Sequence, residues 1–327
     1  MSVRNADSSG KQPTVISTFA GCGGSSLGYK RAGFRELLAV EWDDNAVETF
    51  RLNFPDVPVY HGDICKLTGT ECLQLAGIES GELDVLDGSP PCQGFSTAGQ
   101  RNYDDPRNSL FREFARLLAA LQPRAFVMEN VTGLIKGAMK QAYLRIIKML
   151  RDCGYRASGA VMNAMYFNVP QSRQRVIIIG FRNDLDIEPS HPKPQTKPVT
   201  VYGAIGHLPA GQPGNHQDQV IEAWRASMPG QSLRKARAHV GSFQSVRLDP
   251  RAPSPTQISS HLHWRWDVPR QLTIREAAIL QGFPEDYRWA GTKSKAQKRI
   301  GNSVPPNLMR AIAEHIKEAL GYKDTAM

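Results

Sequence analysis

The chain has 327 residues, of which 41% are hydrophobic and 22% are charged, and its formal net charge of +9 gives an isoelectric point near 9.4. This composition is ordinary for a folded chain of one large or two modest domains, and it excludes a largely disordered protein. The basic excess favours a polyanionic partner, with nucleic acid as the leading candidate.

The five cysteines are odd in number and show no repeated CxxC spacing, which argues against a disulfide framework and fits a reducing cytoplasm. Cys65, Cys72 and His61 match no common zinc spacing, so we interpret them as structural and expect no metal. The polar amino-terminal segment lacks a signal peptide, and no run approaches about 18 apolar residues. We therefore expect a cytoplasmic protein that does not span a membrane.

Short β-rich runs alternate with longer helical patterns from residue 14 to about 181, which predicts an α/β fold. We expect a doubly wound, Rossmann-like parallel sheet with helices on both faces. The predicted strands are Thr14–Phe19, Leu37–Glu41, Val57–Tyr60, Leu83–Asp87, Ala125–Glu129, Arg156–Met162 and Val176–Phe181, and helices are predicted near 24–33, 44–53, 109–121 and 138–152.

The first predicted strand leads directly into the segment Phe19-Ala-Gly-Cys-Gly-Gly24, which opens a helix. Gly21, Gly23 and Gly24 can let a ligand approach the backbone at the amino end of that helix. The segment departs from the dinucleotide fingerprint GxGxxG, because Ser26 or Leu27 stands where the third glycine is needed. This departure argues against a nicotinamide dinucleotide.

The next two strand ends carry side chains suited to an adenosine. Glu41 can accept hydrogen bonds from two ribose hydroxyls, Trp42 offers a stacking surface, and Asp63 can accept from the exocyclic amine of an adenine held against Trp42 or Phe19. Taken singly, the carboxylates could be helix caps and the aromatics could be core residues. Taken in this order, they predict S-adenosylmethionine as the cofactor.

The fourth predicted strand ends in Gly88-Ser-Pro-Pro-Cys-Gln-Gly-Phe-Ser96, a segment poorly suited to a core. Two prolines fix the backbone on the amino side of Cys92, and open α/β sheets place their chemistry at the carboxyl ends of strands. Cys92 is therefore a candidate nucleophile. The alternative is a small buried hydrophobic residue, the usual role of a free cysteine.

The composition of the chain changes after Arg182. Residues 183 to 270 contain eleven of the 22 prolines and six of the eight histidines, which indicates a separate, loop-rich module. Its basic residues, interleaved with Trp264 and Trp266, suit a nucleic-acid face, although a merely solvated basic surface explains the composition equally well. Helices are predicted again at Thr273–Gln281 and at about Asn307 to Leu320.

Because these motifs occur in this order, the chain resembles the DNA cytosine-5 methyltransferases. Its compactness is similar to that of the bacterial stand-alone modification enzymes. The resemblance covers about residues 14 to 182 and 270 to 320. The motifs that carry it are Phe19-Ala-Gly-Cys-Gly-Gly24, Pro90-Pro-Cys-Gln93, Glu129-Asn-Val131, Gln171-Ser-Arg-Gln-Arg175, Arg275-Glu-Ala-Ala-Ile-Leu-Gln-Gly-Phe-Pro284 and Gly301-Asn-Ser-Val304.

The resemblance implies a mechanism for four catalytic residues. The thiolate of Cys92 adds to C6 of cytosine, while the carboxyl group of Glu129 acts at N3 from a secluded site. Arg175 contacts the cytosine carbonyl and Arg173 orders the site; without the family, a surface salt bridge would explain both arginines better. The cytosine must be flipped out of the duplex, and residues 94 to 108 fit a loop that closes over the bound strand.

The resemblance also implies two domains. A catalytic and cofactor-binding domain comprises residues 1–196 and 298–327, and a target-recognition domain with its hinge comprises 197–297. Its Ser254-Pro-Thr-Gln-Ile258 resembles a threonine-containing segment near the target, from which Gln257 departs. Cofactor contacts are implied for Phe19, Gly21, Gly23, Gly24, Glu41, Trp42, Asp63, Ile64, Leu110, Asn302, Ser303 and Val304. Candidate DNA contacts are Ser96, Arg101, Arg234, Arg237, Arg247, Thr256 and Gln257.

The expected partner is double-stranded DNA, with a cognate restriction endonuclease acting on the same site, and we expect a nucleoid-associated monomer in a bacterium. A tRNA cytosine-5 methyltransferase of the same fold is the nearest alternative. A DNA-binding protein with an inactive catalytic domain would require a broken site, whereas Cys92, Glu129 and Arg175 are all present. A nicotinamide-dependent oxidoreductase gives Pro-Pro-Cys-Gln no role and ranks last.

Overall fold

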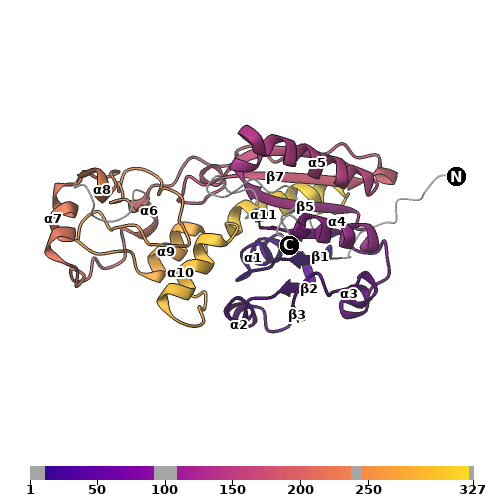
Figure 1. Cartoon of the computed structure of the whole chain (residues 1–327), viewed down its shortest axis with the longest axis horizontal. Coiled ribbons are helices and arrows are strands. Elements are labelled where there is room, and N and C mark those ends of the chain that lie inside the picture. Colours follow the sequence, from indigo (N-terminus) through magenta and orange to yellow (C-terminus); the bar gives the residue numbers. More distant parts are fainter. Residues whose placement is uncertain (1–11, 92–108, 237–244, 324–327) are drawn as a thin grey trace.

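A computed structural model describes residues 12–91, 109–236 and 245–323. Its centre is a seven-stranded sheet in the order β3-β2-β1-β4-β5-β7-β6 (Figure 1). The strands are β1 (Thr14–Thr18), β2 (Arg35–Glu41), β3 (Val59–His61), β4 (Val85–Gly88), β5 (Ala125–Val131), β6 (Tyr155–Asn163) and β7 (Gln174–Arg182). The predicted α/β fold with a Rossmann-like sheet is therefore confirmed, and each predicted strand overlaps one of these.

The prediction of a wholly parallel sheet is wrong for β7. The strands from β1 to β5 pair in parallel, but β7 lies antiparallel between β5 and β6. A parallel pair needs a crossover of about a dozen residues or more, usually with a helix. The connection 164–173 between β6 and β7 is too short for that, and it contains only a single turn of 3-10 helix, Ala164–Tyr166.

Helices cover both faces of the sheet. On one face, α3 (Gly69–Ala76), α4 (Ser109–Leu121) and α5 (Lys140–Asp152) pack against buried side chains such as Ile16, Leu86 and Phe126. On the other face, α1 (Gly24–Arg31) and α11 (Pro306–Ala319) form a second core. The carboxyl-terminal helix α11 packs beside α1, so the last described helix returns to the sheet that the first part of the chain builds.

A third core joins the sheet to the segments that follow it. It contains residues of the loop after β1, residues 19–24, which we call the glycine loop, and of α2 (Asp44–Asn53). Residues of α6 (Val201–Ile205), α9 (Ile274–Gln281) and α10 (Lys293–Asn302) complete it. In Figure 1, α9 and α10 lie between the sheet and a smaller lobe that carries α7 (Asp218–Ala226) and α8 (Leu233–Ala236). Neither α3 nor α10 was predicted from the sequence.

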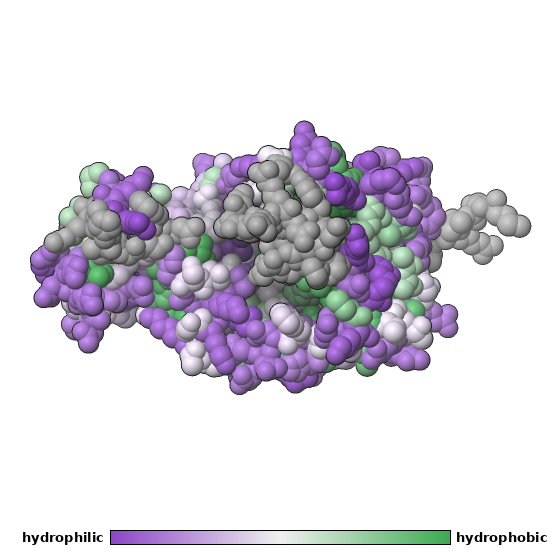
Figure 2. All heavy atoms as spheres, in the orientation of Figure 1, coloured by the Kyte–Doolittle hydropathy of each residue, from purple (hydrophilic) through white to green (hydrophobic). Residues whose placement is uncertain are grey.

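The smaller lobe has its own small core, made of Ala223, Trp224, Leu233 and Trp264. Trp264 is only 4% exposed, so the interpretation of Trp264 as part of a nucleic-acid face is wrong for this structure. Hydrophilic residues predominate on the face of the molecule seen in Figure 2, over the smaller lobe and over the part that contains the sheet. Within the described ranges, no helix is both long enough and apolar enough to cross a membrane.

Candidate active site

The described candidate catalytic and cofactor-binding residues lie at one edge of the sheet, where the strands from β1 to β5 end and β7 begins. This placement follows from the topology, because the carboxyl ends of parallel strands meet at one edge and an antiparallel strand starts there. Four of the predicted residues, Cys92, Ser96, Arg101 and Arg237, fall outside the described residues.

The glycine loop after β1 has an unusual backbone. Gly21 and Gly23 have φ values of 57° and 88°, and Phe19 adopts φ 55°, a left-handed conformation that is uncommon for an aromatic residue. A Cβ on Gly23 would lie 2.4 Å from a ring atom of Phe54. Both conformation and packing therefore require glycine at this position, and the strained Phe19 is typical of a functional loop.

Glu41 connects the glycine loop to the end of β2. One carboxylate oxygen accepts from the amide of Gly21 at 2.8 Å, and the other accepts from the amides of Trp42 at 3.0 Å and Asp43 at 2.9 Å. Asp43, rather than Glu41, is the N-cap of α2. Trp42 is 76% exposed, so its ring is a free surface at this edge and not a core aromatic.

The loop after β3 combines an exposed and a buried residue. Asp63 is exposed and accepts from the amide of Cys65 at 2.9 Å, whereas Ile64 is buried in the core beneath it. Arg116 of α4 donates to the carbonyls of Ile64 at 3.0 Å and Leu67 at 2.8 Å, which holds this loop against the domain. Sequence reasoning missed Arg116, because an arginine in a helical pattern carries no sign of a distant carbonyl partner.

The segment before α11 lies directly against the glycine loop. A Cβ on Gly24 would stand 2.3 Å from the carbonyl oxygen of Val304, so only glycine admits this approach. Gln281 of α9 donates to the carbonyl oxygen of Ser303 at 2.8 Å and fixes the segment from the other side. Asn302, next to them, is exposed, and Leu110 of α4 is half-buried against the core that also holds Phe19.

Glu129 and Arg175 form the centre of the candidate site. The guanidinium Nε of Arg175 lies 2.9 Å from a carboxylate oxygen of Glu129, and the two side chains are 13% and 10% exposed. The antiparallel register places Arg175 opposite Val131, next to Glu129 on the neighbouring strand. The pair is therefore largely buried and is not the exposed salt bridge that was the alternative explanation of Arg175.

The adjacent Asn130 connects this pair to the segment that leads to Cys92. Its side-chain amide donates to the carbonyl oxygen of Pro90 at 2.9 Å, in a buried position two residues before the cysteine. A carboxyl group, a guanidinium and the Pro-Pro segment thus share one corner of the sheet edge. A carboxyl group and a guanidinium from neighbouring strands can together bind a planar polar group.

Arg173 has a different environment from Arg175, although alternate positions of an extended segment should point the same way. Arg173 precedes β7, is fully buried, and donates to the carbonyls of Gln257 at 3.2 Å and Gly301 at 3.0 Å. Burial, reinforced by the charge of Arg175, lowers its pKa from the ordinary value of 12.5. It joins three distant segments of the chain.

The candidate DNA contacts differ in exposure. Gln257 is buried, and Thr256 donates to the carbonyl oxygen of Ser172 at 3.0 Å. Arg247 lies 3.8 Å from the ring centre of Trp224 and donates to the carbonyl oxygens of Trp224, Ser227 and Trp266. These contacts favour a structural role for Arg247. Arg234 on α8 is exposed.

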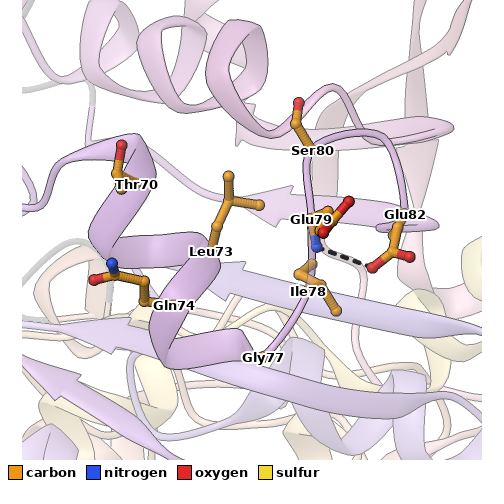
Figure 3. Close-up of a pocket in the computed structure, with 8 residues that line it drawn as sticks. All are labelled: Thr70, Leu73, Gln74, Gly77, Ile78, Glu79, Ser80 and Glu82. Atoms are coloured by element: carbon orange, nitrogen blue, oxygen red, sulfur yellow. Dashed lines mark hydrogen bonds between the residues drawn. The ribbon is translucent and has the colours of Figure 1, made fainter.

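A surface hollow lies away from this edge, between α3 and the turn that leads to β4. Figure 3 shows Leu73 and Ile78 there, with the amide of Glu79 donating to a carboxylate oxygen of Glu82 at 2.9 Å. Because residues 77–82 precede β4, the hollow is at the amino end of that strand. It does not coincide with the candidate active site.

Known proteins resemble this chain over most of its length. A family model described as C-5 cytosine-specific DNA methylase matches residues 13–318. Type II methyltransferase M1.HphI of Haemophilus parahaemolyticus is 38% identical over 93% of this chain and 86% of the relative. Type II methyltransferase M.NgoPII of Neisseria gonorrhoeae is 33% identical over 94% of this chain and 96% of the relative.

Solved structures show the same architecture. A candidate DNA modification methyltransferase encoded within an Escherichia coli prophage has a TM-score of 0.82 and 28% identity, and the match covers 94% of this chain and 99% of that one. The Dnmt2 methyltransferase of S. pombe has a TM-score of 0.66 and 18% identity, covering 95% and 100% of the two chains, which is a likeness of fold alone.

Proposed function

Because the chain belongs to the C-5 cytosine-specific DNA methylase family, we propose that it transfers a methyl group from S-adenosylmethionine to C5 of a flipped-out cytosine in a specific double-stranded DNA sequence. The reaction proceeds through a covalent bond between Cys92 and C6. The observation that supports this most directly is the buried Glu129–Arg175 pair, joined through Asn130 to the segment before Cys92.

The described residues fit S-adenosylmethionine. Gly21 and Gly23 give the loop after β1 a left-handed backbone, Trp42 presents an exposed ring, and the exposed Asp63 and the buried Ile64 follow β3, where we assign the adenine contacts. The carboxylate of Glu41 already accepts three amide hydrogen bonds, and about one acceptor site remains for a ribose hydroxyl. Leu110 and the segment Asn302–Val304 are assigned as further cofactor contacts, supported by the packing of Gly24 against Val304. When bound, the cofactor supplies the methyl group as a sulfonium electrophile.

The residues of the chain carry the remaining chemistry. The thiolate of Cys92 forms a bond to C6, and Glu129 protonates or hydrogen-bonds N3, so electron density moves to C5. Arg175 holds the cytosine carbonyl and keeps Glu129 in place. After C5 has received its methyl group, C5 loses its proton to solvent water, N3 returns any proton it took to Glu129, and Cys92 leaves as a thiolate, which restores the aromatic ring and yields 5-methylcytosine.

Residues 197–297 form the proposed target-recognition domain, with Arg234 and Arg237 as candidate contacts to bases or phosphates and Thr256 near the target. Thr256 and Gln257 lie against Ser172 and Gln171, directly before the catalytic strand. Ser96 and Arg101 are assigned to a loop that closes over the DNA. We further propose a cytoplasmic monomer whose DNA target is shared with a restriction endonuclease.

The test is the transfer of radiolabelled methyl from S-adenosylmethionine to duplex genomic DNA and to tRNA, by the native chain and by Cys92→Ala. We expect label in DNA, recovered as 5-methylcytosine, and its loss in the variant. Label in tRNA alone would reassign the chain to RNA modification. If neither substrate is labelled while the chain binds DNA, it is a binding protein without this activity.

A further inference from the structure

An ion pair outside the assigned residues connects α10 to the end of β2. The guanidinium of Arg299 contacts the carboxylate of Asp43, across 256 residues of sequence, and the two side chains are 10% and 28% exposed. An exposed pair contributes little because water screens it, but removing one partner from a pair this well shielded leaves a poorly solvated charge. We therefore expect the loss of either partner to disturb the local structure.

Asp43 belongs to the hydrogen-bond network of the proposed ribose site. Its amide donates to Glu41 at 2.9 Å, and its carboxylate caps α2 by accepting from the amide of Ala46 at 3.0 Å. Burial alone would raise the pKa of Asp43, but the hydrogen bond from Arg299, with the Ala46 amide, lowers it below its ordinary value. Trp42 lies between Glu41 and Asp43 in the sequence, so a movement of Asp43 would shift Glu41 and Trp42, which are both proposed cofactor contacts.

Arg299 also faces the glycine loop. Its carbonyl oxygen accepts from the thiol of Cys22 at 3.7 Å, and the hydroxyl of Tyr287, in the segment before α10, donates to the carbonyl of Cys22. Three residues after Arg299, the chain enters the segment that packs against Gly24. The side chain of Arg299 thus contacts the end of β2, and its main-chain carbonyl contacts the glycine loop. The chain that follows it leads into the third segment assigned to the cofactor site.

We propose that Arg299 is a positioning residue for the cofactor, because its pairing with Asp43 sets the end of β2 against the glycine loop and the segment Asn302–Val304. Arg299 touches neither the reacting atoms nor the flipped base. The inference rests on the proposed function, since it assumes that S-adenosylmethionine binds at this edge. It predicts a defect in cofactor affinity with the chemical step preserved.

The experiment compares Arg299→Met, Asp43→Asn and Arg299→Lys with the native chain. Asp43→Asn removes the charge but retains a good N-cap, so it decides the matter if Arg299→Met does not fold. Arg310→Met is the matched control, because the same substitution there removes a solvent-exposed ion pair, the one between Arg310 and Glu314 on α11. Calorimetry with S-adenosylhomocysteine gives cofactor affinity, and KM, kcat and duplex DNA affinity are measured in parallel.

We expect Arg299→Met and Asp43→Asn to raise the Kd for S-adenosylhomocysteine and the KM for S-adenosylmethionine about tenfold, the size seen when an outer partner of a binding group is lost. The kcat at saturating cofactor and the DNA affinity should stay within about twofold, Arg299→Lys should recover most of the loss, and Arg310→Met should match the native chain.

Two results would overturn the inference. One is cofactor affinity in Arg299→Met and Asp43→Asn equal to that of the native chain. The other is a parallel loss of cofactor affinity, kcat and DNA affinity, which would mean that the pair only stabilises the fold. A native chain that binds no S-adenosylhomocysteine would instead contradict the proposed function itself, and the inference with it.

Discussion

At the scale of single residues, Glu129 and Arg175 form the candidate site because strand pairing brings their side chains together. Each sits near an end of a strand, and the antiparallel pairing of β5 with β7 brings the side chains together in a largely buried place. The carboxyl group of Glu129 is held by one guanidinium and is largely shielded from water, a setting that supports the acid role proposed for it.

Replacing Glu129 with Gln should remove the acid while retaining the shape of the side chain and a hydrogen bond to Arg175. We expect kcat to fall by about 10²–10⁴-fold, the usual contribution of general acid catalysis, with cofactor affinity nearly unchanged. Single-turnover methylation of a DNA duplex measures the effect. Glu188→Gln, which disrupts the exposed pair with Arg156, serves as the control. Full activity in Glu129→Gln would contradict the role assigned to this residue.

At the scale of elements, the contact between the glycine loop and the segment before α11 depends on a missing side chain. A Cβ on Gly24 would lie 2.3 Å from a backbone oxygen of Val304 and 3.1 Å from the Cβ of Ser303. A flexible side chain could rotate to relieve such a clash, but the backbone carbonyl of Val304 cannot. The close approach therefore makes the two segments, 280 positions apart, behave as one unit.

Gly24→Ala should separate these segments and lower the free energy of unfolding by about 1–3 kcal/mol, the usual cost of overpacking. It should also weaken cofactor binding, because the pocket loses one wall. Urea denaturation and calorimetry with S-adenosylhomocysteine measure the two effects. At Gly133 an added Cβ meets nothing within 4 Å, so Gly133→Ala should leave stability almost unchanged. Equal stability of the two variants would refute the steric explanation.

The smaller lobe depends on Glu276, a buried carboxylate at the start of α9. It contacts Arg265 and Arg270, and it closes a capping box with Thr273. Burial alone would raise its pKa, but hydrogen bonds from Arg270, Thr273 and Arg265 lower it from 4.5 to about 2. A depressed pKa means that ionised Glu276 stabilises the fold above about pH 4.5, and that this stabilisation is lost as the pH falls towards 2.

Glu276→Gln should therefore lower the free energy of unfolding by about 3 kcal/mol at pH 7, since two arginines lose their buried partner. The difference between the native chain and the variant should shrink between about pH 4.5 and 2, where native Glu276 takes up a proton. Urea denaturation at a series of pH values tests both statements. If the difference in the free energy of unfolding is small at neutral pH, or grows on acidification, ionised Glu276 does not stabilise the start of α9.

The sequence predicted the sheet strands and the edge of the sheet that carries the site, because buried strands and glycine-rich turns leave local patterns. It did not predict the antiparallel β7, whose direction depends on the length of a loop, or α3 and α10, which are short helices or have little apolar periodicity. The contacts of Arg116 and Arg299 were also missed. Each joins residues far apart in sequence, and no local spacing marks such partners.

At the scale of the whole molecule, the smaller lobe and the sheet are joined by polar contacts near the active site. Gln171 accepts from the amide of Gln257 and donates to Gln281, and Arg173 spans from Gln257 to Gly301. A Cβ on Gly301 would meet the backbone of Ser259 at 2.3 Å, so the two chain segments are in direct contact. A movement of the smaller lobe, the proposed target-recognition domain, would therefore reach the proposed active site through few intermediate contacts.

The net charge of +9 leads to a prediction about the whole protein. Duplex DNA binding should weaken steeply with salt, because each phosphate contact releases condensed cations; with about 6–10 contacts, affinity falls about 10³–10⁵-fold between 50 and 200 mM salt. Arg234→Gln, on the exposed face of α8, should reduce the log–log slope by about one if it contacts a phosphate. Fluorescence anisotropy across a salt series measures both slopes, with S-adenosylhomocysteine binding as the reference. A nearly flat salt dependence would mean that base contacts or apolar packing, and not the basic surface, hold the DNA.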